Sequence, residues 1–124
     1  MALPKRYRIV LTRQYLILLR KVGKSISSLS LRAFYISSPS LVNSRFAVVV
    51  GASVARKAVV RNRIRRVIQE AILECLPKIL KVDMIVYPKK EIMDVDRKQI
   101  KKEIEQLLKT IVNRQSVTVI KPIL

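Results

Sequence analysis

The sequence has no histidine and no tryptophan, and Cys75 is the single cysteine among 124 residues. The absence of histidine excludes His-based catalytic triads, His metal sites and acid–base catalysis by His. One cysteine cannot form a disulfide within the chain, so we expect a reduced, intracellular protein. Half of the residues are hydrophobic, which excludes a disordered basic tail and predicts one folded domain over residues 1–124.

Long hydrophobic runs are also missing. The longest, at residues 15–19 and 46–50, are far shorter than the roughly 18 residues that a membrane-spanning helix needs. The first residues, MALPKRYR, lack the apolar segment and cleavage site of a secretion signal. We therefore expect a cytoplasmic location and no membrane partner.

Acidic residues are absent from the first half of the chain. Glu70 is the first of them, whereas fifteen Lys and Arg residues lie between positions 1 and 66, and the formal net charge of the whole chain is +18. A surface of this kind repels itself unless a polyanion neutralises it. Nucleic acid is the leading candidate; anionic lipid, or no polyanion at all, remains the alternative.

The hydrophobic pattern predicts alternating helices and strands. Thr12 and Gly23 suit the start and the stop of a first helix, and the tail SVTVIKPIL alternates like a strand without an obvious partner. Because helices back the strands, we expect an α/β (α+β) two-layer sandwich. The predicted helices are 12–20, 59–76 and from Asp94 or Asp96 to about 113, and the predicted strands are 29–36, 45–52 and 83–87, with an edge strand at 25–30.

The predicted helix 59–76 is amphipathic. One side is apolar from Val60 to Leu76, and the other side carries Asn62, Arg63, Arg65, Arg66 and Gln69. The segment KAVVRNRIRR at its start resembles the signature of the protein subunit of bacterial ribonuclease P, which has an Arg-Asn-Arg core. Leu3-Pro4, Gln14-Tyr15 and Leu18-Leu19 stand where that family has related pairs, so the resemblance covers about residues 3–112.

The resemblance implies a fold and a division of labour. It implies a single RNA-binding domain with a mixed four-stranded sheet in the order α-β-β-β-α-β-α and a left-handed crossover through the Arg-rich helix. The tail, 113–124, lies outside the resemblance, and its role is unknown. The resemblance also implies that the RNA subunit uses Mg²⁺ to remove the 5′ leader of precursor tRNA. The protein would bind that RNA and hold the leader in a cleft between the first helix and the sheet. No metal tightly bound to the protein and no protein partner are expected.

Candidate residues follow from this resemblance. Arginine pairs with phosphate oxygens at two points, and unpaired bases stack on aromatic rings. The family's usual Ser-Lys-Lys before the helix is replaced here by Gly51, Ala52 and Ser53. For RNA-subunit binding we expect Arg56, Lys57, Arg61, Asn62, Arg63, Arg65 and Arg66. For leader binding we expect Tyr15, Leu19, Arg32 and Phe34.

Other interpretations of these residues stay open. The arginines also suit a solvated helix face, and Tyr15 and Phe34 also suit an ordinary core. Asp83, Glu91, Asp94 and Asp96 are the acidic residues to weigh as a metal or nuclease cluster, although helix capping explains the last two. A ribosomal or chaperone-like RNA-binding protein is the alternative function, and a stand-alone nuclease is disfavoured.

Overall fold

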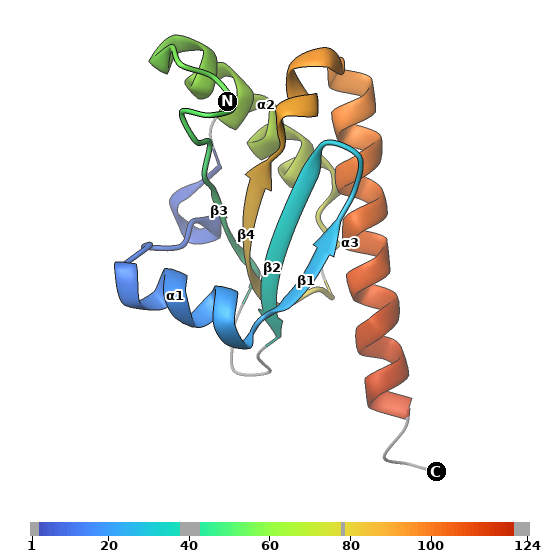
Figure 1. The fold of residues 1–124 in the computed structure, drawn as a ribbon. Helices are drawn as coiled ribbons and strands as arrows, with labels where there is room; N and C mark the ends of the chain where they lie inside the picture. Colours follow the sequence, from blue (N-terminus) through green and yellow to red (C-terminus); the bar gives the residue numbers. More distant parts are fainter. Residues whose placement is uncertain (1–2, 38–42, 78, 121–124) are drawn as a thin grey trace.

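A four-stranded sheet forms the centre of the molecule in a computed structural model, in the strand order β1-β2-β4-β3 (Figure 1). The structure describes residues 3–37, 43–77 and 79–120, with side chains as far as residue 114. The strands are β1 (Lys24–Ser27), β2 (Leu31–Ser37), β3 (Arg45–Val48) and β4 (Val82–Pro88). The helices are α1 (Arg13–Val22), α2 (Ala58–Cys75) and α3 (Arg97–Ile120), with short 3-10 turns η1 (Lys5–Tyr7) and η2 (Lys90–Asp94).

The sheet is mixed, as predicted. β2 pairs antiparallel with both β1 and β4, whereas β3 runs parallel to β4. The chain passes from β3 to β4 through α2, which lies behind the sheet in Figure 1 while β4 lies to the right of β3. This arrangement is the left-handed crossover that the resemblance implies, and it departs from the right-handed rule for parallel strands.

Alternation along β2 and β4 sends side chains to two different faces. Leu31, Ala33 and Tyr35 are buried on one face, whereas Arg32 and Phe34 lie on the other, as the pattern of β2 predicts. The first face packs against α2 and α3 and forms the main core. Its fully buried side chains include Tyr35, Phe46, Ile68, Ile72, Met84, Ile104 and Leu108.

The opposite face of the sheet carries α1, and we call it the α1 face. Leu19 of α1 and Ile85 of β4 are fully buried and belong to one hydrophobic cluster. Leu16, Ile36 and Ala47 pack around this cluster. The two-layer sandwich therefore describes the sheet with α2 and α3. The shorter α1 adds a partial layer on the second face (Figure 1).

Both predicted ends of α1 are confirmed. The Thr12 side chain accepts a hydrogen bond from the backbone N–H of Tyr15 at 3.1 Å, and Gly23 is the C-cap residue. A Cβ atom at position 23 would lie 2.2 Å from the Leu19 carbonyl oxygen and 3.1 Å from that of Tyr35. Only glycine allows the chain to leave α1 and enter β1 this closely.

Several predicted boundaries were wrong. The edge strand β1 covers Lys24–Ser27 and not 25–30, and β2 begins at Leu31 and not at residue 29. β3 ends at Val48 and not at residue 52, because after one further hydrogen bond, from Val49 N–H to the Val86 carbonyl, the chain turns at Gly51. α3 follows Asp96, which accepts from the Gln99 N–H at 2.9 Å, but it extends to Ile120. The first residues of the tail are thus helical, since alternation without a partner strand leaves backbone groups unpaired. Residues 38–42, between β2 and β3, and residues 121–124 of the tail lie outside the described residues.

Glu103 joins α3 to the turn between β1 and β2. Its buried carboxylate accepts hydrogen bonds from the Ser28 hydroxyl, from the Ser30 N–H at 2.8 Å and from the Ser30 hydroxyl at 2.6 Å. Burial by itself raises the pKa of Glu103, but the hydrogen bonds from Ser28, Ser30 and Gln99 together lower the pKa below its usual value. The charged carboxylate is therefore the form that the fold stabilises.

Replacing this carboxylate should destabilise the protein. We expect Glu103→Ala to lower the free energy of unfolding by about 2–4 kcal/mol, because it leaves buried donors of Ser30 without an acceptor. Since folding lowers the Glu103 pKa, its contribution is present above the unfolded pKa near 4.5 and disappears as the pH falls through the lower folded value. Urea unfolding at several pH values measures both effects.

Glu105→Ala is the matched control on the same helix. Glu105 is exposed and, within the described ranges, forms its ion pair with Lys109, so its removal should change stability by less than about 0.5 kcal/mol. Equal decreases for the two variants would contradict the structural role of Glu103.

Candidate nucleic-acid interface

The outer side of α2 and the loop before it carry the predicted cations. Arg63 and Arg66 are exposed on the helix, and Arg61 and Arg65 are partly exposed. Lys57 is the N-cap residue of α2, and within the described residues no side-chain hydrogen bond caps this end of the helix. We name this region the α2 cationic surface; it consists of Arg56, Lys57, Arg61, Asn62, Arg63, Arg65 and Arg66.

Most of the positive charge of this surface is not neutralised by carboxylates. Glu70, one turn after Arg66 on α2, is the nearest acidic residue along the helix and pairs with Arg97 at 3.4 Å. In the part of the chain that the structure describes, the other ion pairs lie elsewhere: Asp83 with Arg45, Glu74 with Lys101 and Glu105 with Lys109. The positive charge of the α2 cationic surface therefore faces outward.

Two of the arginines have structural partners. Arg61 donates from Nη1 to the Ala55 carbonyl at 3.0 Å and to the Arg56 carbonyl at 2.6 Å, and so braces the loop that enters α2. Asn62 accepts a hydrogen bond from Arg65 Nη1 at 2.6 Å. Asn62 therefore orients a neighbouring arginine, whereas Arg63 and Arg66 have no such hydrogen bond within the described residues.

The loop from Gly51 to Ser53 brings no cation of its own. It is exposed, and its turn is closed by hydrogen bonds from the Val54 and Ala55 N–H groups to the Gly51 carbonyl. A Cβ atom at Gly51 would meet no described atom closer than 3.6 Å, so glycine is not sterically required there. The nearest exposed cations in sequence are Arg56 and Lys57.

The α1 face holds the second group of predicted residues. Arg32 is exposed and Phe34 is half-buried on β2. Phe34 packs edge to face with Tyr87 of β4, with ring centroids 5.9 Å apart, and the Arg20 guanidinium of α1 lies 5.4 Å from the Tyr87 ring centroid. The sheet and α1 thus bring two aromatic rings and two arginines together.

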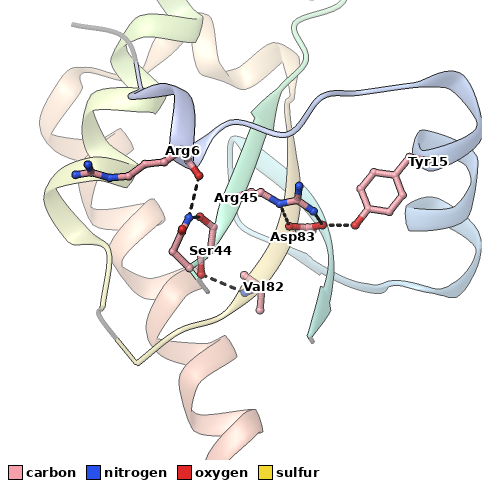
Figure 2. Close-up of polar contacts among 7 residues, drawn as sticks. Arg6, Tyr15, Ser44, Arg45, Val82 and Asp83 are labelled. Carbon is pink, nitrogen blue, oxygen red and sulfur yellow. Dashed lines mark hydrogen bonds and ion pairs between the residues drawn. The ribbon is translucent and has the colours of Figure 1, made fainter. Parts of the chain in front are cut away.

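Tyr15 lies at the other end of α1 in a polar network (Figure 2). Its hydroxyl donates to Asp83 Oδ2, and Arg45 donates to the same carboxylate from Nε at 2.9 Å and from Nη2 at 2.6 Å. Burial and the nearby Asp83 carboxylate raise the pKa of Tyr15 to about 12. The Tyr15 hydroxyl is therefore a hydrogen-bond donor across the whole physiological range.

The sequence prediction for this face was incomplete. Leu19 is fully buried in the packing between α1 and the sheet, so its side chain offers no exposed wall to a ligand. Tyr87 and Arg20 were not predicted. The period-two pattern of β4, which places Tyr87 on the same face as Asp83 and Ile85, was the available signal for the ring; Arg20 required the position of α1.

The acidic residues form no metal centre within the described residues, where no group of three His, Cys, Asp or Glu side chains is placed to hold an ion. Asp83 is engaged by Arg45 and Tyr15, and Asp96 caps α3. None of the helices in the described ranges has the length and hydropathy of a membrane-spanning segment.

Comparison with known families decides the identity. A family model described as Ribonuclease P matches residues 3–112, which include the sheet, α1, α2 and most of α3. The chain belongs to the ribonuclease P protein family. The resemblance carried by the Arg-Asn-Arg segment is thereby confirmed, and the protein is an RNA-binding component of the ribonucleoprotein ribonuclease P, which processes tRNA.

Solved structures of this family share the fold. The RNase P protein of Staphylococcus aureus is 26% identical with a TM-score of 0.75, over 85% of this chain and 94% of that chain. A mutant of that protein with defective mRNA degradation activity is 26% identical with a TM-score of 0.76, over 86% of this chain and 89% of that chain. The RNase P protein of Thermotoga maritima is 28% identical with a TM-score of 0.70, over 83% of this chain and 96% of that chain. No curated protein sequence matches the chain.

The network around Tyr15 predicts a pH dependence of stability. A phenol whose pKa rises on folding, here from 10.0 to about 12, stabilises the fold fully below pH 10, and this effect disappears as the pH rises toward 12. We expect Tyr15→Phe to lower the free energy of unfolding by about 1–2 kcal/mol at pH 8. The difference from the wild type should shrink between pH 10 and pH 12, as measured by urea unfolding.

Tyr7→Phe is the control for this experiment. Its hydroxyl makes no hydrogen bond within the described residues, so its removal should give no pH-dependent difference. A Tyr15→Phe difference that stayed constant from pH 8 to pH 12 would contradict the hydrogen bond to Asp83.

Proposed function

We propose that this ribonuclease P family member binds the RNA subunit of ribonuclease P through the α2 cationic surface and holds the 5′ leader of precursor tRNA on the α1 face. The RNA would carry out the Mg²⁺-dependent cleavage, and the protein would hold both RNAs together. The observation that carries the proposal is the exposed arginine surface on α2. Within the described residues, most carboxylates pair with cations elsewhere and do not neutralise this surface.

The side chains of α2 suit a folded RNA backbone. Arginine offers a planar set of donors that matches phosphate oxygens, and the exposed Arg63 and Arg66 can use it. Arg65, held by Asn62, presents a fixed guanidinium beside them. Because Asn62 already holds Arg65, this side chain gives up little entropy on binding.

The α1 face suits a single strand of variable sequence. Phe34 and Tyr87 supply rings on which unpaired bases stack without base specificity, and Arg20 and Arg32 supply charge for the phosphates. This face lies on the opposite side of the sheet from the core formed with α2 and α3. The separation supports two distinct RNA contacts on one small protein.

The chain itself offers poor chemistry for phosphodiester hydrolysis. It contains no histidine, and its buried aspartate, Asp83, is held by Arg45. Reconstitution tests this proposal directly. Added at low Mg²⁺ to a bacterial ribonuclease P RNA, the protein should restore 5′ maturation of precursor tRNA, whereas the protein alone should cut nothing. A ribosomal or chaperone-like RNA-binding protein would give no such restoration.

Removal of the two exposed arginines should weaken binding to the RNA subunit. We expect Arg63→Ala with Arg66→Ala to reduce the slope of log K against log salt concentration by roughly 0.7–0.9 for each phosphate that is no longer neutralised. Filter binding at several salt concentrations measures the slope. The control is Lys98→Ala with Lys102→Ala, which removes the same charge from exposed positions on α3 and should leave the slope nearly unchanged.

Removal of a stacking ring should instead act on the leader. We expect Phe34→Ala to weaken binding of precursor tRNA by roughly 5- to 150-fold, since stacking of one base contributes about 1–3 kcal/mol. Mature tRNA should bind as before. Leu29→Ala, which truncates an exposed apolar side chain close to β2, is the control. Equal effects on precursor and mature tRNA would refute the assignment of the leader to the α1 face.

A further inference from the structure

Asp83 is a buried carboxylate where α1, β3 and β4 meet (Figure 2). Its side chain is 3% exposed, and both oxygens are used: Oδ1 accepts from Arg45 Nε, and Oδ2 accepts from Arg45 Nη2 and from the Tyr15 hydroxyl. Arg45 and Asp83 are also direct neighbours in the register of β3 and β4. One carboxylate thus connects a helix side chain to two parallel strands.

The location of this carboxylate is unfavourable on charge alone. It lies on the α1 face, where Arg20 and Arg32 bring positive charge for the phosphates of a leader. A negative charge there repels phosphates, and burying it requires compensation by Arg45. Electrostatics alone therefore predicts that a neutral residue at position 83 would improve RNA binding.

The geometry points to a different purpose for Asp83. Its hydrogen bond to Tyr15 fixes the first turns of α1 on the sheet, and Arg20 lies five residues further along the same helix, about 7.5 Å along its axis. Arg20 is the residue that lies over the Tyr87 ring. The hydrogen bond from Tyr15 thus helps to determine where Arg20 lies over the Tyr87 ring.

Arg45 is oriented by the same carboxylate. Asp83 occupies Nε and Nη2, whereas Nη1 has no hydrogen-bond partner among the described residues. The Arg45 side chain is 39% exposed. The outer edge of the guanidinium is therefore held in a defined direction and stays available to a phosphate.

We propose that Asp83 is a positioning residue for the single-stranded leader, which holds Tyr15 and Arg45 so that α1 and the Arg45 guanidinium are prearranged on the α1 face. This inference rests on the proposed binding of the leader. It assigns Asp83 no contact with RNA, and it adds Arg45 to the residues that meet the leader phosphates. The contribution of prearrangement exceeds the repulsion that the carboxylate causes.

The decisive variant is Asp83→Asn in the reconstituted holoenzyme, because charge and position predict opposite results. The variant adds one net positive charge, which by itself would tighten binding of a precursor with a long leader. We expect it instead to raise the KM for that precursor by about 3–10-fold, an effect typical of coupled side chains. The kcat, and the KM for a precursor with a one-nucleotide leader, should stay unchanged.

Tyr15→Phe gives a second and milder test. It keeps the ring and removes only the hydroxyl that donates to Asp83, so it decides the question if Asp83→Asn does not fold. We expect a smaller rise in KM, about 2–5-fold, again confined to the long leader, and no further rise when it is combined with Asp83→Asn. Tyr7→Phe is the matched control and should leave both substrates unaffected.

The outcomes separate this inference from the proposed function. A wild-type protein that fails to restore 5′ maturation, or fails to favour long leaders, overturns the proposed function itself. A wild-type protein that does both, with variants that bind the long leader as well as or better than the wild type, overturns the role of Asp83 only. Equal effects on both leader lengths overturn it as well, since they indicate a general structural defect.

Discussion

The sharing of β4 between two different neighbours is the constraint on which the structure depends. β4 pairs antiparallel with β2 and parallel with β3, so its backbone is hydrogen-bonded on both edges and its side chains must serve two faces. Met84 and Val86 enter the core with α2 and α3, whereas Asp83, Ile85 and Tyr87 lie on the α1 face. A shift of one residue in this register would exchange the two sets.

This constraint also separates the two surfaces proposed for RNA. The parallel pairing of β3 and β4 requires a crossover, and α2 provides it on the face opposite α1. The α2 cationic surface and the aromatic residues near α1 are therefore fixed relative to each other by one small sheet. A rigid spacing of this kind suits the proposed binding of two RNAs.

Three of the acidic residues hold elements of the fold in place. Asp83 holds α1 and β3, Glu103 holds α3 to the turn before β2, and Asp96 starts α3. Asp83 and Glu103 are buried and accept from donors that burial would otherwise leave unsatisfied, whereas Asp96 caps α3 from an exposed position. In the described part of the chain, Asp83 pairs with Arg45, and the other ion pairs involve cations of the second half, so most of the cations of the first half remain available to a polyanion.

Much of this could be predicted from the sequence, since it depends on neighbours along the chain. Local properties of the sequence determined the elements, the cationic helix face and the family. These properties are the alternation in β2, the amphipathic pattern of α2, the caps at Thr12 and Gly23, and the absence of Asp and Glu from the first half of the chain. The end of β3, the helical course of the tail and the burial of Leu19 were missed. The contacts that were not predicted join residues up to 68 positions apart. They are the packing of Tyr87 with Phe34 and Arg20, and the hydrogen bonds of Tyr15 and Arg45 to Asp83. Only the tertiary structure decided these contacts, because sheet register and helix placement bring distant side chains together and no local pattern encodes them.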